Sequence, residues 1–342
     1  MAVPRPVEEV RGVTPDAIPF DEILEGQRPM VFKGMVADWP LVRQGLQSPG
    51  AAIAYLKAFD GGEPVVGYTG GPEIGGRFFY DDTLTRLNFR AERVGLSAFL
   101  DRMAATPDDG DAPSLYIGST DLDGYLPGFR AENDLGLDPA AFGGRDPLVS
   151  IWIGNRTTAA AHYDMSNNIA CCVVGRRRFT LFPPDQVANL YPGPLEPTPG
   201  GQVVTTVDLR DPDFERFPRV RDALARAQVA DLEPGDVLVY PALWWHEVEA
   251  LEPFNALVNY WWNPSPGFVD TPQTTLLHAL LSLRDRPEHE KAGWRALFDY
   301  YVFGPSDAAA SHLPEAAQGL LGPLDEMKAR RLRAQLINRL NR

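Results

Sequence analysis

The chain has 342 residues, of which 44% are hydrophobic and 23% charged, a composition typical of a globular protein with a large core. Its net charge of −14 argues against a general nucleic-acid surface, because phosphate contacts need clustered lysine and arginine, whereas a basic peptide partner stays open. The only two cysteines are adjacent, which excludes a disulfide framework, and no apolar run is long enough for a signal core or a membrane span. We therefore expect a soluble, cytoplasmic protein that binds neither nucleic acid nor membrane.

Residues 1–113 mix helical and extended patterns. A helical start at "PFDEIL" precedes a short apolar strand expected at 29–32. Further along, the spacing of apolar residues predicts a helix at 51–59, a strand at 63–70 and a helix at 94–104. We interpret this part as a mixed α/β section packed on the rest of the protein.

Residues 114–266 have a different texture, because short β-rich runs follow one another. The runs are "SLYIGS", "PLVSIWIGN", "NIACCVVG", "RRFTLFPP", "GQVVTTVDL", "DVLVYPALWWHEVEAL" and "ALVNYWWN". Glycine, proline, asparagine and aspartate punctuate them, a pattern that predicts an antiparallel sandwich or barrel.

Residues 267–342 are helical in pattern. Thr271 and Pro272 form a plausible cap and first-turn pair, and the last run places Leu332, Leu336, Ile337 and Leu340 on one face. No serine- or glycine-rich linker separates the three parts. The predicted fold is therefore mainly β with helices: an all-β core, the N-terminal section packed on it, and an appended helical tail.

The stretch "AAHYDMSNN" raises the question of a metal site. On an extended backbone, positions i and i+2 point to the same face, so His162 and Asp164 would project together. They would supply two ligands of a facial triad of two histidines and one carboxylate. Of the remaining histidines, only His246 lies in the β-rich part, on a late strand after the Gly-Asp pair at 235–236. The alternative is a chance tripeptide and an ordinary core histidine.

A family resemblance supports the metal interpretation. "HYDMSNNIACCVVGRRRFTLFPPDQVANLYP", "VDLRDPDFERFP", "EPGDVLVYPALWWHEVEAL" and "NALVNYWWN" resemble the JmjC-type, cupin-like oxygenases that depend on Fe(II) and 2-oxoglutarate. The similar subgroup is the one that contains the asparaginyl hydroxylase factor inhibiting HIF. The resemblance is strong from about residue 116 to 263 and weaker at "RPMVFKGMVADWP" and "RFFYDD".

The resemblance implies a double-stranded β-helix in which His162, Asp164 and His246 bind Fe(II). The open metal positions would take 2-oxoglutarate and O2, and decarboxylation to succinate would accompany hydroxylation of a nearby C–H bond. The distal carboxylate needs a buried cation, and Arg177 stands where the family usually has lysine. Tyr116 matches a tyrosine that helps to hold the same carboxylate; an ordinary strand tyrosine is the alternative.

Other positions of the chain match the family pattern less completely. Asn168 and Asn259 match family amides near the cosubstrate, and Trp261 would be a wall of the pocket. Ala159 departs from the family, which has a threonine there, so one hydrogen bond to 2-oxoglutarate is lost unless Thr157 or Thr158 supplies it. Tyr80, in "RFFYDD", is a candidate substrate-facing aromatic, with a core or rim position as the alternative.

Substrate identity does not follow from the resemblance. The expected activity is hydroxylation of a protein side chain or a small molecule. The rival interpretations are a metal-dependent cupin isomerase or sugar-modifying enzyme, and a binding protein that keeps the cupin fold without turnover. The helical tail resembles the region that pairs two subunits in related hydroxylases, so a homodimer is expected; docking of the tail on its own core is the alternative.

Overall fold

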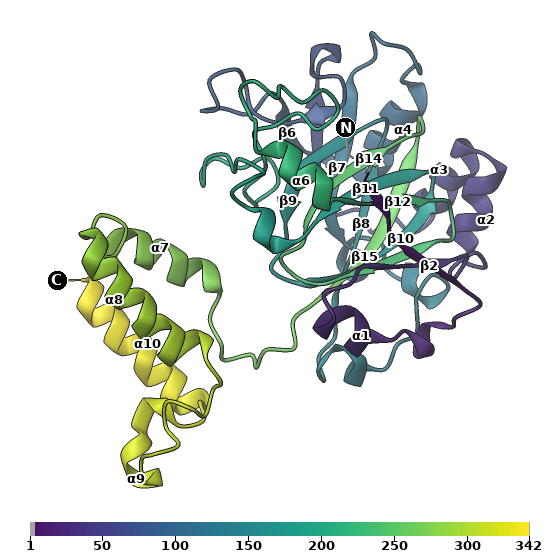
Figure 1. Cartoon of the computed structure of the whole chain (residues 1–342). Helices are drawn as coiled ribbons and strands as arrows, with labels where there is room; N and C mark the ends of the chain where they lie inside the picture. The colour runs from purple at the N-terminus through teal and green to yellow at the C-terminus, as the bar shows by residue number, and fades with distance from the viewer. Residues whose placement is uncertain (1–3, 342) are drawn as a thin grey trace. The chain divides into compact units, whose positions relative to one another are not determined.

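The computed structural model describes residues 4–341, which divide into two compact units. The first ends at Pro264 and the second begins at Ser265. The first unit contains two β-sheets, with chain order coloured from purple to green in Figure 1.

The larger sheet has nine strands, and the N-terminal section contributes to both of its edges. Its spatial order is β2 (Glu8–Arg11), β3 (Met30–Lys33), β13 (Val237–Tyr240), β10 (Asn167–Val174), β15 (Asn255–Trp262), β8 (Leu148–Gly154), β7 (Ser114–Asp121), β4 (Pro64–Gly70) and β6 (Arg90–Gly95). Most neighbouring strands are antiparallel, and only β2 and β3 run parallel. The N-terminal section is therefore built into the sheet rather than lying beside it.

The smaller sheet has six strands and carries most of the candidate metal ligands. Its order is β1 (Arg5–Pro6), β12 (Gln228–Leu232), β11 (Arg177–Phe182), β14 (Trp245–Ala250), β9 (Thr158–Tyr163) and β5 (Arg77–Phe78). Apolar side chains of β11 and β12 pack against those of β10 and β13 in one buried cluster. The two sheets therefore face each other, which confirms the predicted double-stranded β-helix core.

Strand β10 shows why an uninterrupted apolar run folds this way. All of its residues are buried, because one face meets the other sheet and the opposite face meets helices. Ala170 and Cys172 belong to the cluster between the sheets, whereas Ile169 and Cys171 belong to the cluster beneath the helices. This alternation is the two-residue period of an extended chain.

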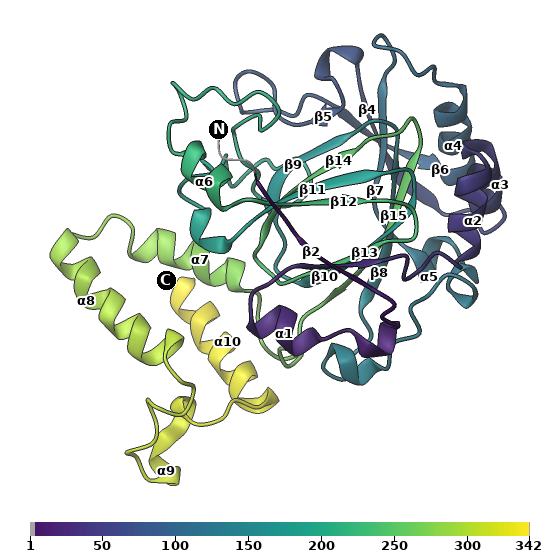
Figure 2. The same cartoon turned by 45° about the vertical axis from the view of Figure 1, so that its right-hand side comes forward.

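Helices cover the outer face of the nine-stranded sheet. They are α1 (Phe20–Glu25), α2 (Pro40–Gln47), α3 (Pro49–Lys57), α4 (Leu96–Ala105) and α5 (Leu122–Tyr125), and Figure 2 shows α2, α3 and α4 side by side. Helix α6 (Val220–Arg226) packs instead against β11. The short 3-10 helices of this unit are η1 (Pro15–Ala17), η2 (Pro72–Ile74), η3 (Phe129–Ala131), η4 (Pro139–Phe142) and η5 (Pro184–Gln186).

One predicted strand is wrong. The run "GQVVTTVDL", residues 201–209, forms only isolated bridges, Val204 with His162 and Thr205 with Pro192. Strand β5 already occupies the free edge of β9 at Thr158 and Ala159, so little of that edge remains for a second neighbour. The run is therefore a loop that touches the sheet at single residues.

The Gly-Asp pair at 235–236 fastens the turn before β13. The buried carboxylate of Asp236 accepts hydrogen bonds from the Gly34 amide at 2.9 Å and the Glu233 amide at 2.8 Å, and it pairs with the Lys33 ammonium. The ion pair between Lys33 and Asp236 joins the end of β3 to the turn before β13, and both of its side chains are largely buried. Because removal of one partner leaves the other charge buried without compensation, the carboxylate is needed for stability.

We expect Asp236→Ala to lower the free energy of unfolding by about 3–5 kcal/mol, measured by urea denaturation. Adding Lys33→Met should recover only part of the loss, because the Gly34 and Glu233 amides stay unpaired. A change below about 1 kcal/mol for the single variant would show that the pair is not a structural anchor.

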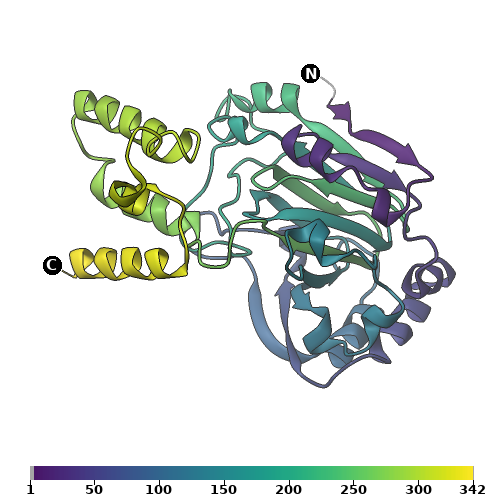
Figure 3. The same ribbon diagram turned by 90° about the horizontal axis from the view of Figure 1, so that it is seen from below.

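The second unit is helical. It contains α7 (Pro272–Ser282), α8 (Glu288–Phe298), the π-helix η6 (Asp299–Phe303), α9 (Glu315–Gln318), η7 (Gly319–Leu321) and α10 (Glu326–Leu340), coloured green to yellow in Figure 3. Thr271 is the N-cap of α7 and Pro272 its first residue, as predicted. Among the described residues of this unit, only alanines at 309, 310 and 329 are buried hydrophobics. In residues 4–341, no helix is long and apolar enough to span a membrane.

Candidate metal and cosubstrate site

Three side chains with metal-binding atoms converge between β9 and β14. His162 lies near the end of β9, Asp164 follows just beyond it, and His246 is the cross-strand partner of His162 on β14. One ligand atom from each residue lies within 4.8 Å of the others. Of all groups of histidine, cysteine and carboxylate within residues 4–341, this is the one whose geometry could hold a metal ion.

Backbone carbonyls set the protonation of both imidazoles. His162 Nδ1 lies 2.9 Å from the Ala160 carbonyl oxygen, and His246 Nδ1 lies 3.0 Å from that of Trp244. A carbonyl only accepts, so each Nδ1 carries a proton, which leaves Nε2 as the nitrogen of the neutral ring that can bind a metal. A metal-bound histidine needs this tautomer. Its Nδ1 commonly donates to a backbone carbonyl, as both histidines do here, and this hydrogen bond holds the ring in place.

The electrostatics of His246 and Asp164 favour a metal site over an ion pair between these two side chains. Burial, reinforced by neighbouring His162, lowers the pKa of His246 well below its usual range, so this imidazole is neutral. Burial raises the pKa of the Asp164 carboxyl, and His162 acts in the opposite direction. His246 Nε2 and Asp164 Oδ2 are 3.6 Å apart. Two imidazoles and one carboxylate match the donor set of non-haem Fe(II), so the residues fit this metal.

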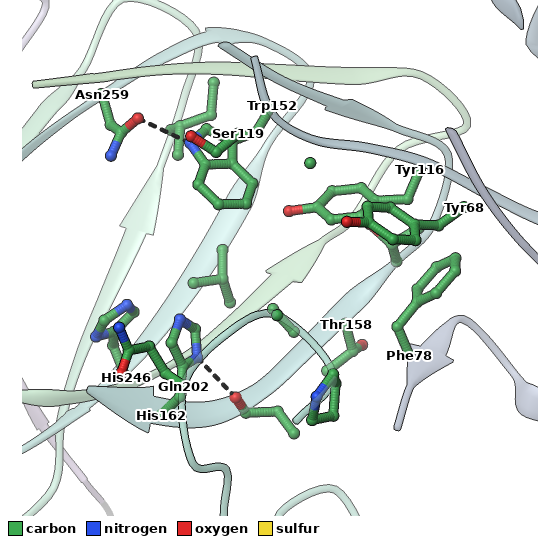
Figure 4. A pocket seen from close by; sticks show the side chains of 18 of the residues that line it. Tyr68, Phe78, Tyr116, Ser119, Trp152, Thr158, His162, Gln202, His246 and Asn259 are labelled. Atoms are coloured by element: carbon green, nitrogen blue, oxygen red, sulfur yellow. Dashed lines mark hydrogen bonds between the residues drawn. The ribbon is translucent and has the colours of Figure 1, made fainter. Parts of the chain in front are cut away.

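The triad lines a cavity of about 280 Å³ that reaches into the space between the sheets. Figure 4 shows His162 and His246 on one side of the cavity, with Tyr116, Trp152 and Asn259 across from them. The cavity is large enough to hold a small molecule beside a metal ion.

Arg177 is a buried cation in the same cavity. It begins β11 and is 3% exposed. Its Nη2 donates to the Trp152 carbonyl over a long 3.4 Å, and its buried Nε has no hydrogen-bond partner within residues 4–341. Burial lowers the pKa of the guanidinium, although the group stays charged. No carboxylate pairs with it in the part of the chain that the structure describes.

The neighbouring arginines show the contrast. Arg176 bonds Glu252 at 2.6 Å and Arg178 bonds Asp231 at 2.7 Å, and both arginine side chains are about half exposed. Both arginines therefore lie in solvent-exposed ion pairs. Only the middle arginine is buried and uncompensated, and an anion is the ligand that such a charge favours.

Further polar side chains line the same cavity as Arg177. Burial raises the pKa of Tyr116, so its phenol is neutral and can donate. Asn168 donates from Nδ2 to the Tyr240 hydroxyl at 2.7 Å, while its buried Oδ1 has no partner among the described residues. Asn259 Oδ1 accepts from Trp152 Nε1 at 2.7 Å. All three predicted residues, Tyr116, Asn168 and Asn259, line the cavity.

Ala159 lies on β9 in the cavity wall, where it offers no hydroxyl. Thr157 and Thr158 also line the cavity. The two threonines are therefore near enough to the site to offer the hydrogen bond that Ala159 cannot.

Two predicted site residues lie elsewhere. Trp261 does not line the cavity, because the Trp152 ring packs edge-on against it at 5.6 Å and itself forms the wall. Tyr80 lines a separate cavity with Arg77 and Phe79. The chain leaves the sheet after Phe78, so strand parity no longer aims Tyr80 at the metal.

The sequence reasoning also missed residues that line the site. Gln202 lies in the loop at 201–209, where the sequence predicts a strand, and its only sequence signal is the preceding glycine pair. Tyr68 and Phe78 lie on β4 and β5, where aromatic residues are common in any core. Their place in the site depends on long-range strand pairing.

Comparison with known proteins shows the family to which the chain belongs. A family model described as a cupin-like domain matches residues 15–268, and the chain therefore belongs to the cupin-like, JmjC-type family. HSPB1-associated protein 1 of Rattus norvegicus is 27% identical over 303 residues, covering 83% of this chain and 59% of the relative. The homologue of that protein in Danio rerio is 38% identical over 123 residues, which cover 35% and 27% of the two chains.

A further relative is lysine-specific demethylase 8 of Danio rerio, which is 26% identical over 248 residues, covering 71% of this chain and 55% of the relative. The chain thus spans less than two thirds of the length of these relatives.

Proposed function

We propose that the protein is an Fe(II)- and 2-oxoglutarate-dependent oxygenase that hydroxylates its substrate. The observation that carries the proposal is a two-histidine, one-carboxylate triad that shares a cavity with a buried arginine lacking a counter-ion. A metal-only isomerase or sugar-modifying cupin has no need of such a cation. The names of relatives in the family, lysine-specific demethylases among them, are in keeping with oxygenase chemistry.

Each residue has a defined task in this proposal. His162, Asp164 and His246 would hold Fe(II), since two imidazoles and one carboxylate are a donor set that this metal takes. Arg177 binds the distal carboxylate of 2-oxoglutarate through its planar fork, and Tyr116 donates a further hydrogen bond. When bound, Fe(II), 2-oxoglutarate and O2 supply the oxidising chemistry, whereas the protein binds, orients and excludes water.

The amides and threonines complete the cosubstrate site. Asn259 Oδ1 accepts from Trp152 Nε1, which leaves Asn259 Nδ2 to donate to 2-oxoglutarate, whereas the unpartnered Asn168 Oδ1 accepts from a water molecule in the cavity. Thr157 or Thr158 replaces the hydroxyl missing at Ala159. The cosubstrate is thereby held without the lysine and the threonine typical of the family.

The test is an anaerobic titration of the purified protein with Fe(II), followed by 2-oxoglutarate. We expect a metal-to-ligand charge-transfer band only when both are present, and succinate production after O2 is admitted. Metal binding without the band or succinate would favour a metal-dependent cupin isomerase or sugar-modifying enzyme. No metal binding at all would favour a non-catalytic binding protein.

We also propose that the helical unit joins two copies of the chain. Exposed apolar residues lie on each of its long helices: Leu276, Leu277 and Leu281 on α7, Trp294 and Leu297 on α8, and Leu336, Ile337 and Leu340 on α10. A unit with so few buried apolar residues is stabilised by a partner surface, and a second copy is the commonest one.

We expect light scattering after size-exclusion chromatography to give twice the chain mass of 37.7 kDa. The double variant Leu336→Glu with Ile337→Glu should give the single-chain mass, because two charges cannot be buried in an apolar interface. Leu46→Glu, at an exposed leucine of α2, is the matched control and should stay dimeric. A wild-type protein of single-chain mass at micromolar concentration would contradict the proposal.

The two free, buried thiols, Cys171 and Cys172, are in keeping with a reducing compartment. We therefore propose the cytoplasm as the location, which imaging of a fluorescently tagged chain would test.

A further inference from the structure

A second cavity, of about 510 Å³, shares no lining residue with the metal cavity among the residues that the structure describes. The stretch "RFFYDD" contributes Arg77, Phe79, Tyr80, Asp81 and Asp82 to its wall, and the loop at 206–216 contributes further residues. Its volume is one at which small-molecule sites are found. The proposed function makes no use of this cavity.

The wall formed by "RFFYDD" is held in place by its neighbours. Asn88 Nδ2 donates to the Arg77 carbonyl at 3.0 Å, and Asn88 Oδ1 accepts from the Phe79 amide at 2.8 Å. Tyr80 forms an isolated bridge with Leu87. The Arg77 guanidinium lies over the Phe79 ring, 3.6 Å from its centroid. A ligand would therefore meet a wall that is already ordered, which favours binding.

Two buried hydrogen-bond donors of this wall have no partner. Arg77 Nη2 donates to the Val207 carbonyl at 2.9 Å, whereas the buried Arg77 Nε has no partner within residues 4–341. Tyr80 is 4% exposed, and its hydroxyl is likewise without a partner in the described chain. A buried donor left unpaired is destabilising, so both groups favour a ligand that offers an acceptor.

The charge of Arg77 also lacks a direct counter-ion. Burial lowers the pKa of its guanidinium, and Asp208 and Glu247 act in the opposite direction from a distance. Neither forms an ion pair with Arg77 in the structure of residues 4–341, and Asp208 pairs with Arg210 instead, at 3.3 Å. The guanidinium stays charged. A carboxylate is the acceptor that matches such a group best.

The exposed part of the cavity has the opposite preference. Glu73 and Asp82 line it, both are exposed, and neither carboxylate forms a hydrogen bond or ion pair in the part of the chain that the structure describes. The Asp81 carboxylate, by contrast, already accepts hydrogen bonds within its own turn. The one exposed cation is Arg216, which lies over the Phe217 ring, 5.0 Å from its centroid. Two free carboxylates against one guanidinium favour a positively charged group.

We propose that this second cavity binds a small zwitterion, with its carboxylate on Arg77 Nε and the Tyr80 hydroxyl and its ammonium toward Glu73 and Asp82. A ligand with both charges provides partners for the buried donors and for the exposed carboxylates. A ligand with a single charge leaves one of these sets without a partner. The site is separate from the metal cavity, so the inference does not depend on the proposed oxygenase function.

The probes are ω-amino acids with one to five methylene groups between the amine and the carboxylate. Binding to the purified full chain is measured by isothermal titration calorimetry. We expect one chain length to bind with a dissociation constant below about 1 mM. It should bind at least about tenfold more tightly than its N-acetyl form, which lacks the positive charge, and its amide form, which lacks the negative one. No binding at any chain length, or equal binding of the capped forms, would overturn the inference.

Variants of the wall locate the two ends of the probe. Tyr80→Phe keeps the ring and should weaken the tightest probe by about tenfold, because one hydrogen bond to its carboxylate is lost. Tyr300→Phe, at an exposed tyrosine of the helical unit, is the matched control and should bind as the wild type does. The double variant Glu73→Gln with Asp82→Asn should weaken the zwitterion but not its N-acetyl form. Unchanged affinity in Tyr80→Phe, or equal losses for both forms in the double variant, would contradict the assignment.

The metal cavity also contains a buried arginine, so the titration is repeated on Arg177→Met. Retained affinity for the zwitterion is expected, since Arg177 does not line the second cavity. Lost affinity would place the probe at Arg177 and overturn the inference. The charge-transfer band with Fe(II) and 2-oxoglutarate tests the oxygenase by itself, so the two proposals can fail independently.

Discussion

Replacing Asp164 by alanine should abolish turnover of 2-oxoglutarate and weaken Fe(II) binding by more than about a hundredfold. Loss of an outer partner of a metal ligand already costs 10–100-fold, and Asp164 is the single carboxylate among the three candidate ligands. Affinity is measured anaerobically by competition with a chelator, and turnover by succinate production. Retained turnover would mean that another carboxylate completes the site.

The same variant should leave the apoprotein folded. The Asp164 carboxylate lies close to both histidines, 3.6 Å from His246 Nε2, while its backbone carbonyl accepts from the Leu243 amide at 2.8 Å whatever the side chain. Removal of a buried carboxylate relieves a desolvation cost, so the thermal midpoint without metal should not fall. Asp38→Ala, at a fully exposed aspartate, is the matched control and should keep both activity and stability.

The sequence predicted the elements with a strong local pattern. The apolar run of β10 and the helical spacing of α3 and α4 each depend on neighbours within one element. The His-x-Asp spacing also acts locally, since both side chains follow from one extended segment. The sequence alone did not locate the partner of β9, because pairing of β14 with β9 joins segments more than 80 residues apart.

The wrong predictions, at residues 201–209 and at Trp261, and the missed Gln202 share a physical cause. The segment around Val204 has a β-rich composition, yet β5 takes the edge of β9 that it would have needed. Trp261 has the parity of Asn259, but the Trp152 ring fills the space in front of it. Gln202 lines the site from a loop outside the sheets. In each case tertiary competition, which no local pattern encodes, decided the outcome.

Replacing Arg177 by methionine should raise the 2-oxoglutarate concentration needed for half-maximal turnover by about 30-fold or more. Removing one member of a buried, hydrogen-bonded charge pair costs about 2–5 kcal/mol, and each 1.4 kcal/mol is a factor of ten. The Fe(II) requirement should change by less than about twofold, since the triad is untouched. Arg177→Lys should give an intermediate effect, because lysine keeps the charge but lacks the planar fork.

The stability of the apoprotein should not fall in Arg177→Met, in contrast to its affinity for 2-oxoglutarate. Without 2-oxoglutarate, the guanidinium is buried with one long hydrogen bond and no carboxylate among the described residues. An apolar side chain of similar length removes that cost, so the thermal midpoint of the apoprotein should stay level or rise for Arg177→Met. Arg178→Met, which breaks only an exposed pair with Asp231, should change neither property appreciably. A lower thermal midpoint, together with equal losses of affinity for Fe(II) and for 2-oxoglutarate, would make Arg177 a structural residue. A more stable protein that binds 2-oxoglutarate poorly would show that the charge of Arg177 is kept buried for its ligand.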